Sequence, residues 1–94
     1  MKKENEVEMY ALHLLQKNDL KKVMSDKTKK VLKKYDLAVT PSPNPQMFLT
    51  TILFHSPEER KKCGTELEEL GIAIAYEVAP AYVDRKYVGD VQWI

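Results

Sequence analysis

Apolar and polar positions divide the chain into a helical part and a part of mixed strands and helix. Residues 5–17 carry apolar side chains at the three- and four-residue spacing of a core helix: Val7, Tyr10, Ala11, Leu14 and Leu15. Met9 and Leu12 fall outside this stripe and widen the apolar surface of the predicted helix. The extra width is explained by a helix buried on more than one side, or by a contact between two copies of the chain, because a small domain gains burial by association.

A second helical segment is predicted from Leu20 to Tyr35. At 100° per residue its apolar positions gather on one side, and Lys22, Lys29 and Lys33 lie within about 40° of one another on the other side. Ser25 is a good N-cap residue, so the pattern leaves open whether this segment is one helix or two short ones.

The sequence TPSPNPQ at residues 40–46 separates the two parts, because its three prolines favour extended backbone. The four residues LAVT just before Pro41 are consistent with a short strand that leads into it. After it, MFLTTILF at 47–54 predicts a strand buried on both faces. Ser56, Pro57 and Glu59 form the signature of a capping box, and Gly71 is the expected C′ glycine, which predicts a helix over 57–70. Gly64 inside this helix is interpreted as permitting close packing.

Residues 72–79 alternate apolar side chains with alanine and Glu77, which predicts a strand parallel to 47–54 and joined to it by a right-handed crossover. Pro80 predicts a break or bulge near the end of this strand. The last residues, 81–94, are predicted to form a hairpin that turns near Asp84 and Arg85. The resulting β-α-β-β order resembles half of a ferredoxin-like domain in topology.

We therefore expect a single α+β domain over residues 1–94. Two N-terminal helices (1–39) and a proline-rich connection (40–46) precede a β-α-β-β part (47–94). The sheet is expected to be mixed and three- to four-stranded, with helices mainly on one face.

Composition and charge narrow the class of protein. The chain has 94 residues, of which 44% are hydrophobic and 31% charged, as in a folded soluble domain. Its single cysteine, Cys63, excludes an intrachain disulfide, and no apolar run suits a signal peptide or a membrane span, so we expect a cytoplasmic protein without a membrane partner. The first 50 residues hold ten lysines and six acidic residues, whereas residues 51–94 hold five basic and eight acidic residues.

The lysine-rich segment is the first candidate site. Lys22, Lys29, Lys30 and Lys33 are placed to contact nucleic-acid phosphates or an acidic protein partner. Against nucleic acid, the helix has no arginine, and its only aromatic residue, Tyr35, falls on the apolar side. A solvated helix face explains the same lysines.

A second candidate lies where the strand 47–54 meets the following helix. His55 and Ser56 occupy the carboxyl end of a strand and a helix N-terminus, where a ligand could bind and His55 could act as an acid or base. The capping box alone also accounts for these residues. Cys63 falls on the apolar helix face, where a thiol is inert, and no closely spaced ligand pair indicates a metal, so no metal or cofactor is expected.

A third candidate is an aromatic surface near the C-terminus: Tyr76, Tyr82, Tyr87 and Trp93. A sheet face packed by the helices explains the same residues. Together with the dimer contact at Met9 and Leu12, the aromatic surface favours a small non-enzymatic interaction or regulatory protein that forms a homodimer. The alternatives are a nucleic-acid-binding protein that uses the lysine-rich helix and a small enzyme or ligand-binding module centred on His55.

Overall fold

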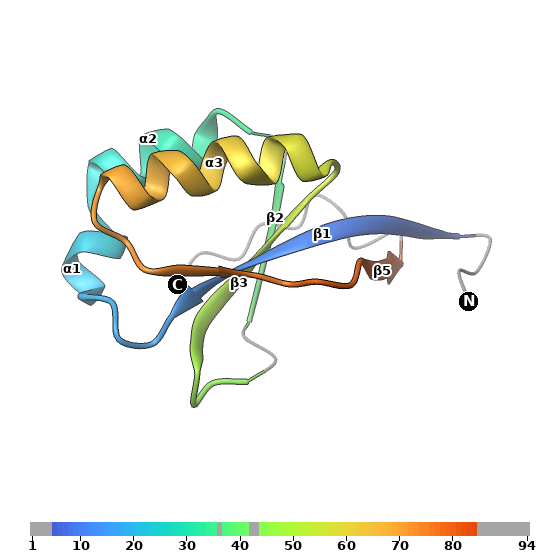
Figure 1. Cartoon of the computed structure of the whole chain (residues 1–94), viewed down its shortest axis with the longest axis horizontal. Helices are drawn as coiled ribbons and strands as arrows, with labels where there is room; N and C mark the ends of the chain where they lie inside the picture. The colour runs from blue at the N-terminus through green and yellow to red at the C-terminus, as the bar shows by residue number, and fades with distance from the viewer. Residues whose placement is uncertain (1–4, 36, 42–43, 85–94) are drawn as a thin grey trace.

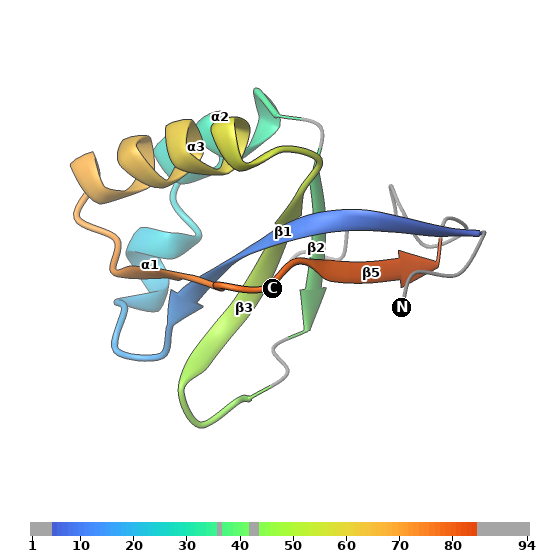
Figure 2. The same ribbon diagram turned by 45° about the vertical axis from the view of Figure 1, so that its right-hand side comes forward.

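The computed structural model describes residues 5–35, 37–41 and 44–84, and for 37–41 it describes the backbone alone. Within these ranges the chain forms an α+β fold whose elements follow in this order: β1 (Glu6–Leu15), α1 (Leu20–Val23), α2 (Asp26–Lys33), β2 (Leu37–Pro41), β3 (Phe48–Phe54), α3 (Pro57–Glu69), β4 (Ile74–Tyr76) and β5 (Ala81–Asp84). In Figures 1 and 2, α2 and α3 lie side by side over the same side of the sheet.

The first element is a strand, so the predicted helix over 5–17 is wrong. β1 pairs with β3 on one side, from Tyr10 opposite Phe54 to Leu15 opposite Phe48. On its other side it pairs with β4 and then with β5. The middle of β1 is buried on both faces, because Leu12 and Leu14 belong to one core cluster and Met9 and Ala11 to another.

The sheet has the strand order β2-β3-β1-β4, and every pairing between described strands is antiparallel. β3 and β4 run in the same direction, as predicted, but β1 lies between them. The expected mixed sheet is therefore wrong as to its pairings. With helical segments between β1 and β2 and between β3 and β4, the chain has the complete split β-α-β order of a ferredoxin-like domain.

β4 and β5 follow the same side of β1 with an interruption between them. From Leu12 to Met9 β1 advances three residues, whereas its partner advances five, from Tyr76 to Ala81. Two extra residues are thus accommodated in the stretch that ends at Pro80, which confirms the predicted break at this proline. Asp84 is the last residue of β5, and the second arm of the predicted hairpin lies outside the described residues.

The larger part of the core lies between the helices and one face of the sheet. β1 and β3 contribute Leu12, Leu14, Ile52 and Phe54, and the helices contribute Val23, Leu32, Cys63 and Leu67. On the opposite face Met9, Ala11 and Leu53 form a second cluster, against which Val7, Ala81 and Val83 pack. Met9 and Leu12 are therefore core residues of one chain, each 0% exposed, and the dimer contact predicted for them is not available.

Helix boundaries follow local signals that the sequence carries. Ser25 accepts a hydrogen bond from the Thr28 amide and begins α2, so the lysine-rich segment is two helices. Ser56 accepts from the Glu59 amide at 3.2 Å and begins α3. Gly71 has φ +81°, and the amides of Gly71 and Ile72 donate to Glu68 and Leu67, which is a Schellman ending.

Candidate functional site

The surface of α1 and α2 is dominated by lysine. All seven lysines between Leu20 and Tyr35 are exposed, and Asp26 is the only acidic residue of this segment. On α2, Thr28 and Leu32 are the buried positions, so Lys30 and Lys33 lie on the opposite side of the helix. Lys29, Lys30 and Lys33 thus share one exposed helix surface, which we call the α2 lysine surface together with Lys27 and Lys34.

Lys22 does not belong to this surface, because the break at Ser25 places it on a separate helix. Its Nζ lies 2.9 Å from the position that a Cβ on Gly71 would take. The ammonium group therefore lies at the C-terminal end of α3, where the partial negative charge of the helix favours a cation. The single stripe of Lys22, Lys29 and Lys33 predicted for a continuous helix does not form.

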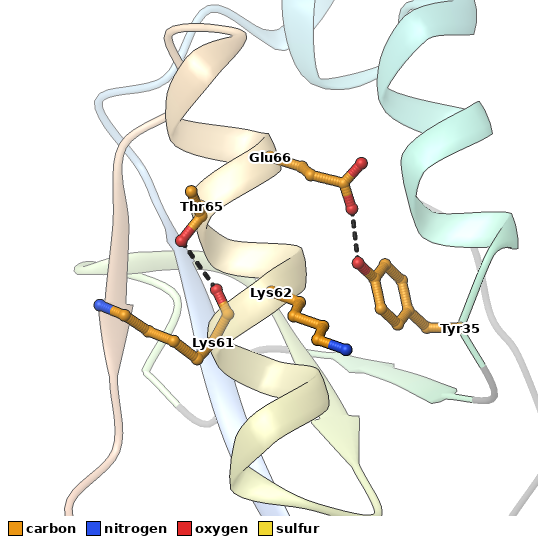
Figure 3. Close-up of a pocket in the computed structure, with 5 residues that line it drawn as sticks. All are labelled: Tyr35, Lys61, Lys62, Thr65 and Glu66. Carbon is orange, nitrogen blue, oxygen red and sulfur yellow. Dashed lines mark hydrogen bonds between the residues drawn. The ribbon is translucent and has the colours of Figure 1, made fainter.

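An open hollow lies between the end of α2 and the middle of α3. Its volume is about 390 Å³, and it is lined by Tyr35, Lys61, Lys62, Thr65 and Glu66. Figure 3 shows the side chain of Lys62 directed toward Tyr35, whereas Lys61 extends away from it. The Nζ of Lys61 lies 5.5 Å from the ring centroid of Tyr76, and the hydroxyl of Thr65 donates to the Lys61 carbonyl.

Glu66 connects the two helices at this hollow. Its carboxylate forms an ion pair with Lys34 and accepts a hydrogen bond of 2.5 Å from the Tyr35 hydroxyl. The hydrogen bonds from Lys34 and Tyr35 lower the pKa of Glu66 below its ordinary value. Burial, and then the hydrogen bond to Glu66, raise the pKa of Tyr35 well above its ordinary value, so Tyr35 stays a neutral donor.

Cys63 lies on the buried side of α3 and is 0% exposed. Burial raises the pKa of its thiol to about 12. A thiol without access and without thiolate character cannot serve as a nucleophile at neutral pH, which agrees with its interpretation as a core residue.

His55 and Ser56 lie at the predicted junction of β3 and α3. His55 is exposed, and the Ser56 side chain is occupied as the N-cap of α3. The capping function of Ser56 is thus confirmed, whereas a ligand at this edge, with His55 as acid or base, stays a prediction.

Tyr76 lies under α3 rather than on an open sheet face. A Cβ on Gly64 would come within 2.1 Å of its hydroxyl oxygen, so Gly64 permits close packing, as predicted. Arg60 lies 5.3 Å from the Tyr76 ring and 5.9 Å from the Tyr10 ring. Its Nη1 also donates to the carbonyls of Ala11 and Glu77, which fixes the start of α3 to the sheet.

Of the other aromatic residues predicted to form a surface, the structure describes only Tyr82, which unlike Tyr76 is not covered by α3. Tyr82 is 43% exposed, and its hydroxyl donates to Glu8 at 3.4 Å, close to the 3.2 Å bond from Tyr10 to the same carboxylate. Tyr87 and Trp93 lie outside the described residues. A partner contact at this aromatic surface therefore stays a prediction for Tyr82.

A buried histidine network was missed by the sequence analysis. His13 is 4% exposed, and its Nδ1 is 2.7 Å from the Thr51 hydroxyl while its Nε2 is 3.1 Å from the Glu77 carboxylate. Its ring stacks on Phe48 with centroids 4.1 Å apart. Because His13 and Thr51 are both buried, a substrate cannot reach them, and the network acts as a structural link between three strand regions. Only the correct strand assignment for residues 6–15 would have placed His13 opposite Thr51.

The described residues contain no group of three or more histidine, cysteine, aspartate or glutamate side chains that could hold a metal ion. Within the same ranges, no helix is long and apolar enough to cross a membrane. Comparison with family models, curated proteins and solved structures finds no match to this chain.

Proposed function

We propose that this protein is a non-enzymatic nucleic-acid-binding protein that contacts phosphates through the α2 lysine surface. The observation that carries the proposal is the display of exposed lysines on α2 with one acidic residue, Asp26, among them. Lysine side chains on phosphates supply affinity through the release of counterions and need no fixed base contacts.

Two structural facts raise this function above the self-associating interaction protein that the sequence ranked first. Met9 and Leu12 are buried in the core of one chain, so the argument for a homodimer loses its main support. Tyr35, whose place on the apolar side of the helix spoke against nucleic acid, packs against the core but also lines a surface hollow beside lysines. The oligomeric state itself stays a prediction.

The helix layer is also the more suitable side of this fold for a ligand. Some RNA-binding domains with a four-stranded sheet stack bases on aromatic residues of the open sheet face. Here the corresponding face of β1 and β3 carries Ala11, His13, Thr51 and Leu53, each at most 5% exposed. A nucleic acid would therefore bind on α2 and α3 rather than on the sheet.

Fluorescence anisotropy with a labelled twelve-residue oligo-dT at low salt tests this proposal. The variant Lys29→Glu/Lys33→Glu is expected to weaken binding by at least about tenfold, because it places two carboxylates where phosphates would lie. The variant Lys29→Arg/Lys33→Arg keeps the charge and is the matched control, expected to bind like the wild type. Absence of binding by the wild type at 50 mM salt, or equal affinity of the charge-reversal variant, would exclude the proposal.

An acidic protein partner is the second candidate. The observation in its favour is that Leu20, which begins α1, and Met24, its C-cap residue, are 49% and 42% exposed among the lysines. Apolar side chains gain little from phosphates but would bury area against an acidic amphipathic segment. If Leu20→Ser/Met24→Ser leaves oligo-dT binding unchanged, these residues have no part in the nucleic-acid contact, and a reduced affinity would assign them to it.

A further inference from the structure

We propose that the hollow between α2 and α3 binds one unpaired base of a single-stranded nucleic acid, with the base against the ring of Tyr35. The inference rests on the proposed function and adds a ligand class to it: single strands with accessible bases rather than duplexes.

The ring of Tyr35 is held in place from two sides. Its hydroxyl donates to Glu66, and its ring meets Phe54 edge-on, with centroids 6.2 Å apart and planes at 77°. A ring fixed in this way loses little conformational entropy when a flat ligand stacks on it. Phe54 is fully buried, so the support of Tyr35 belongs to the core.

The other walls of the hollow suit a base as well. Lys61, Lys62, Thr65 and Glu66 line the rest of the hollow, and the aliphatic parts of such side chains offer carbon surface to a flat ligand. The volume of about 390 Å³ lies within the range of roughly 300–1,000 Å³ that small-ligand sites show. The Glu66 carboxylate, neutralised by Lys34, can accept a hydrogen bond from an N–H group of a base, which in thymine is the ring N3–H.

The positive charge around the hollow indicates where the sugar-phosphate backbone of a bound strand would lie. Lys62 is directed toward Tyr35, and Lys34 belongs to the α2 lysine surface, which extends from the rim along α2. A strand that follows α2 would place phosphates near Lys30 and Lys33 and direct one base toward Tyr35. A duplex keeps its bases stacked inside and cannot fill the hollow in this way.

An abasic oligomer separates the base contact from the phosphate contacts. Anisotropy is measured with oligo-dT and with a twelve-residue abasic strand of the same phosphate number. The wild type is expected to bind oligo-dT roughly 5- to 150-fold more tightly, which is the effect of one stacked base. Tyr35→Leu is expected to abolish this difference, whereas Tyr35→Phe, which retains the ring, preserves it.

Thr65→Leu fills part of the hollow from an exposed position and should reduce the same ratio without disturbing the core, which circular dichroism checks in every variant. Equal affinity of the wild type for both strands would overturn the base site and leave the phosphate-binding function standing. Failure of the wild type to bind either strand would overturn both. Tighter binding to a duplex of equal length would also overturn the inference.

Discussion

Gly64 of α3 packs closely against Tyr76 of the sheet. A methyl group on Gly64 would lie 2.1 Å from the Tyr76 hydroxyl oxygen and 2.9 Å from its Cζ. The same hydroxyl is buried and has no hydrogen-bond partner among the described residues. The residue pair therefore joins tight packing to an unfavourable buried polar group.

Gly64→Ala is expected to lower the free energy of unfolding by about 1–3 kcal/mol, although alanine is the better helix former. Tyr76→Phe is expected to leave this free energy unchanged or to raise it by up to about 1 kcal/mol, because it removes the unpaired hydroxyl. Urea denaturation measures both. The double variant should lose less than Gly64→Ala alone, and an equal loss would show that the hydroxyl is not the obstacle.

His13 links β1 to Thr51 of β3 and to Glu77 after β4. His13→Leu removes both hydrogen bonds and the stacking on Phe48, so the free energy of unfolding is expected to fall by about 1–3 kcal/mol. Glu77→Gln keeps an acceptor for His13 at a half-exposed position and should cost less than about 1 kcal/mol. A His13→Leu variant as stable as the wild type in urea would contradict this role.

At the scale of elements, β1 shows how a pattern can be misread. Residues 9 and 11–14 are all buried, because the middle of β1 lies between two neighbouring strands and has core on both faces. Such a run has apolar residues at helical spacings as well as at strand spacings, so periodicity alone cannot separate the two. Residues 6–15 form a strand because they pair with β3, β4 and β5, and these partners lie outside the segment itself.

Elements whose ends are marked by a capping residue, a glycine or a proline were predictable from the sequence. Ser25 and Ser56 begin helices, Gly71 ends one with a positive φ, and Pro80 is the last residue of the interruption between β4 and β5. Each of these signals acts within one or two turns of its own backbone. The hollow between α2 and α3 could not be predicted, because it depends on how two helices 24 or more residues apart in sequence approach each other.

The N-cap of α3 offers a test at this scale. Ser56→Ala removes the acceptor of the Glu59 amide and is expected to lower the free energy of unfolding by about 0.5–2 kcal/mol. Ser56→Asp retains an N-cap acceptor and should be close to the wild type in thermal or urea denaturation. Equal losses in the two variants would mean that Ser56 acts through something other than capping.

For the whole molecule, the arrangement of charge matters more than its sum. The net charge is only +1, yet seven lysines lie on one part of the surface. Six of them are on α1 and α2, and Lys34 directly follows α2. In Figure 1 this part and the β1–β5 ribbon lie toward opposite ends of the molecule. A local positive surface of this kind attracts a polyanion even when the chain as a whole is nearly neutral.

The dependence of oligo-dT affinity on salt concentration is the decisive test of phosphate binding by the α2 lysine surface. Between 50 and 200 mM salt, three to five phosphate contacts predict a slope of about −2 to −4 in a plot of log K against log salt concentration. In Lys29→Glu/Lys33→Glu the slope should become shallower by at least about 1, because two contacts are lost. A slope near zero in the wild type, or the same slope in both proteins, would contradict phosphate binding by the α2 lysine surface.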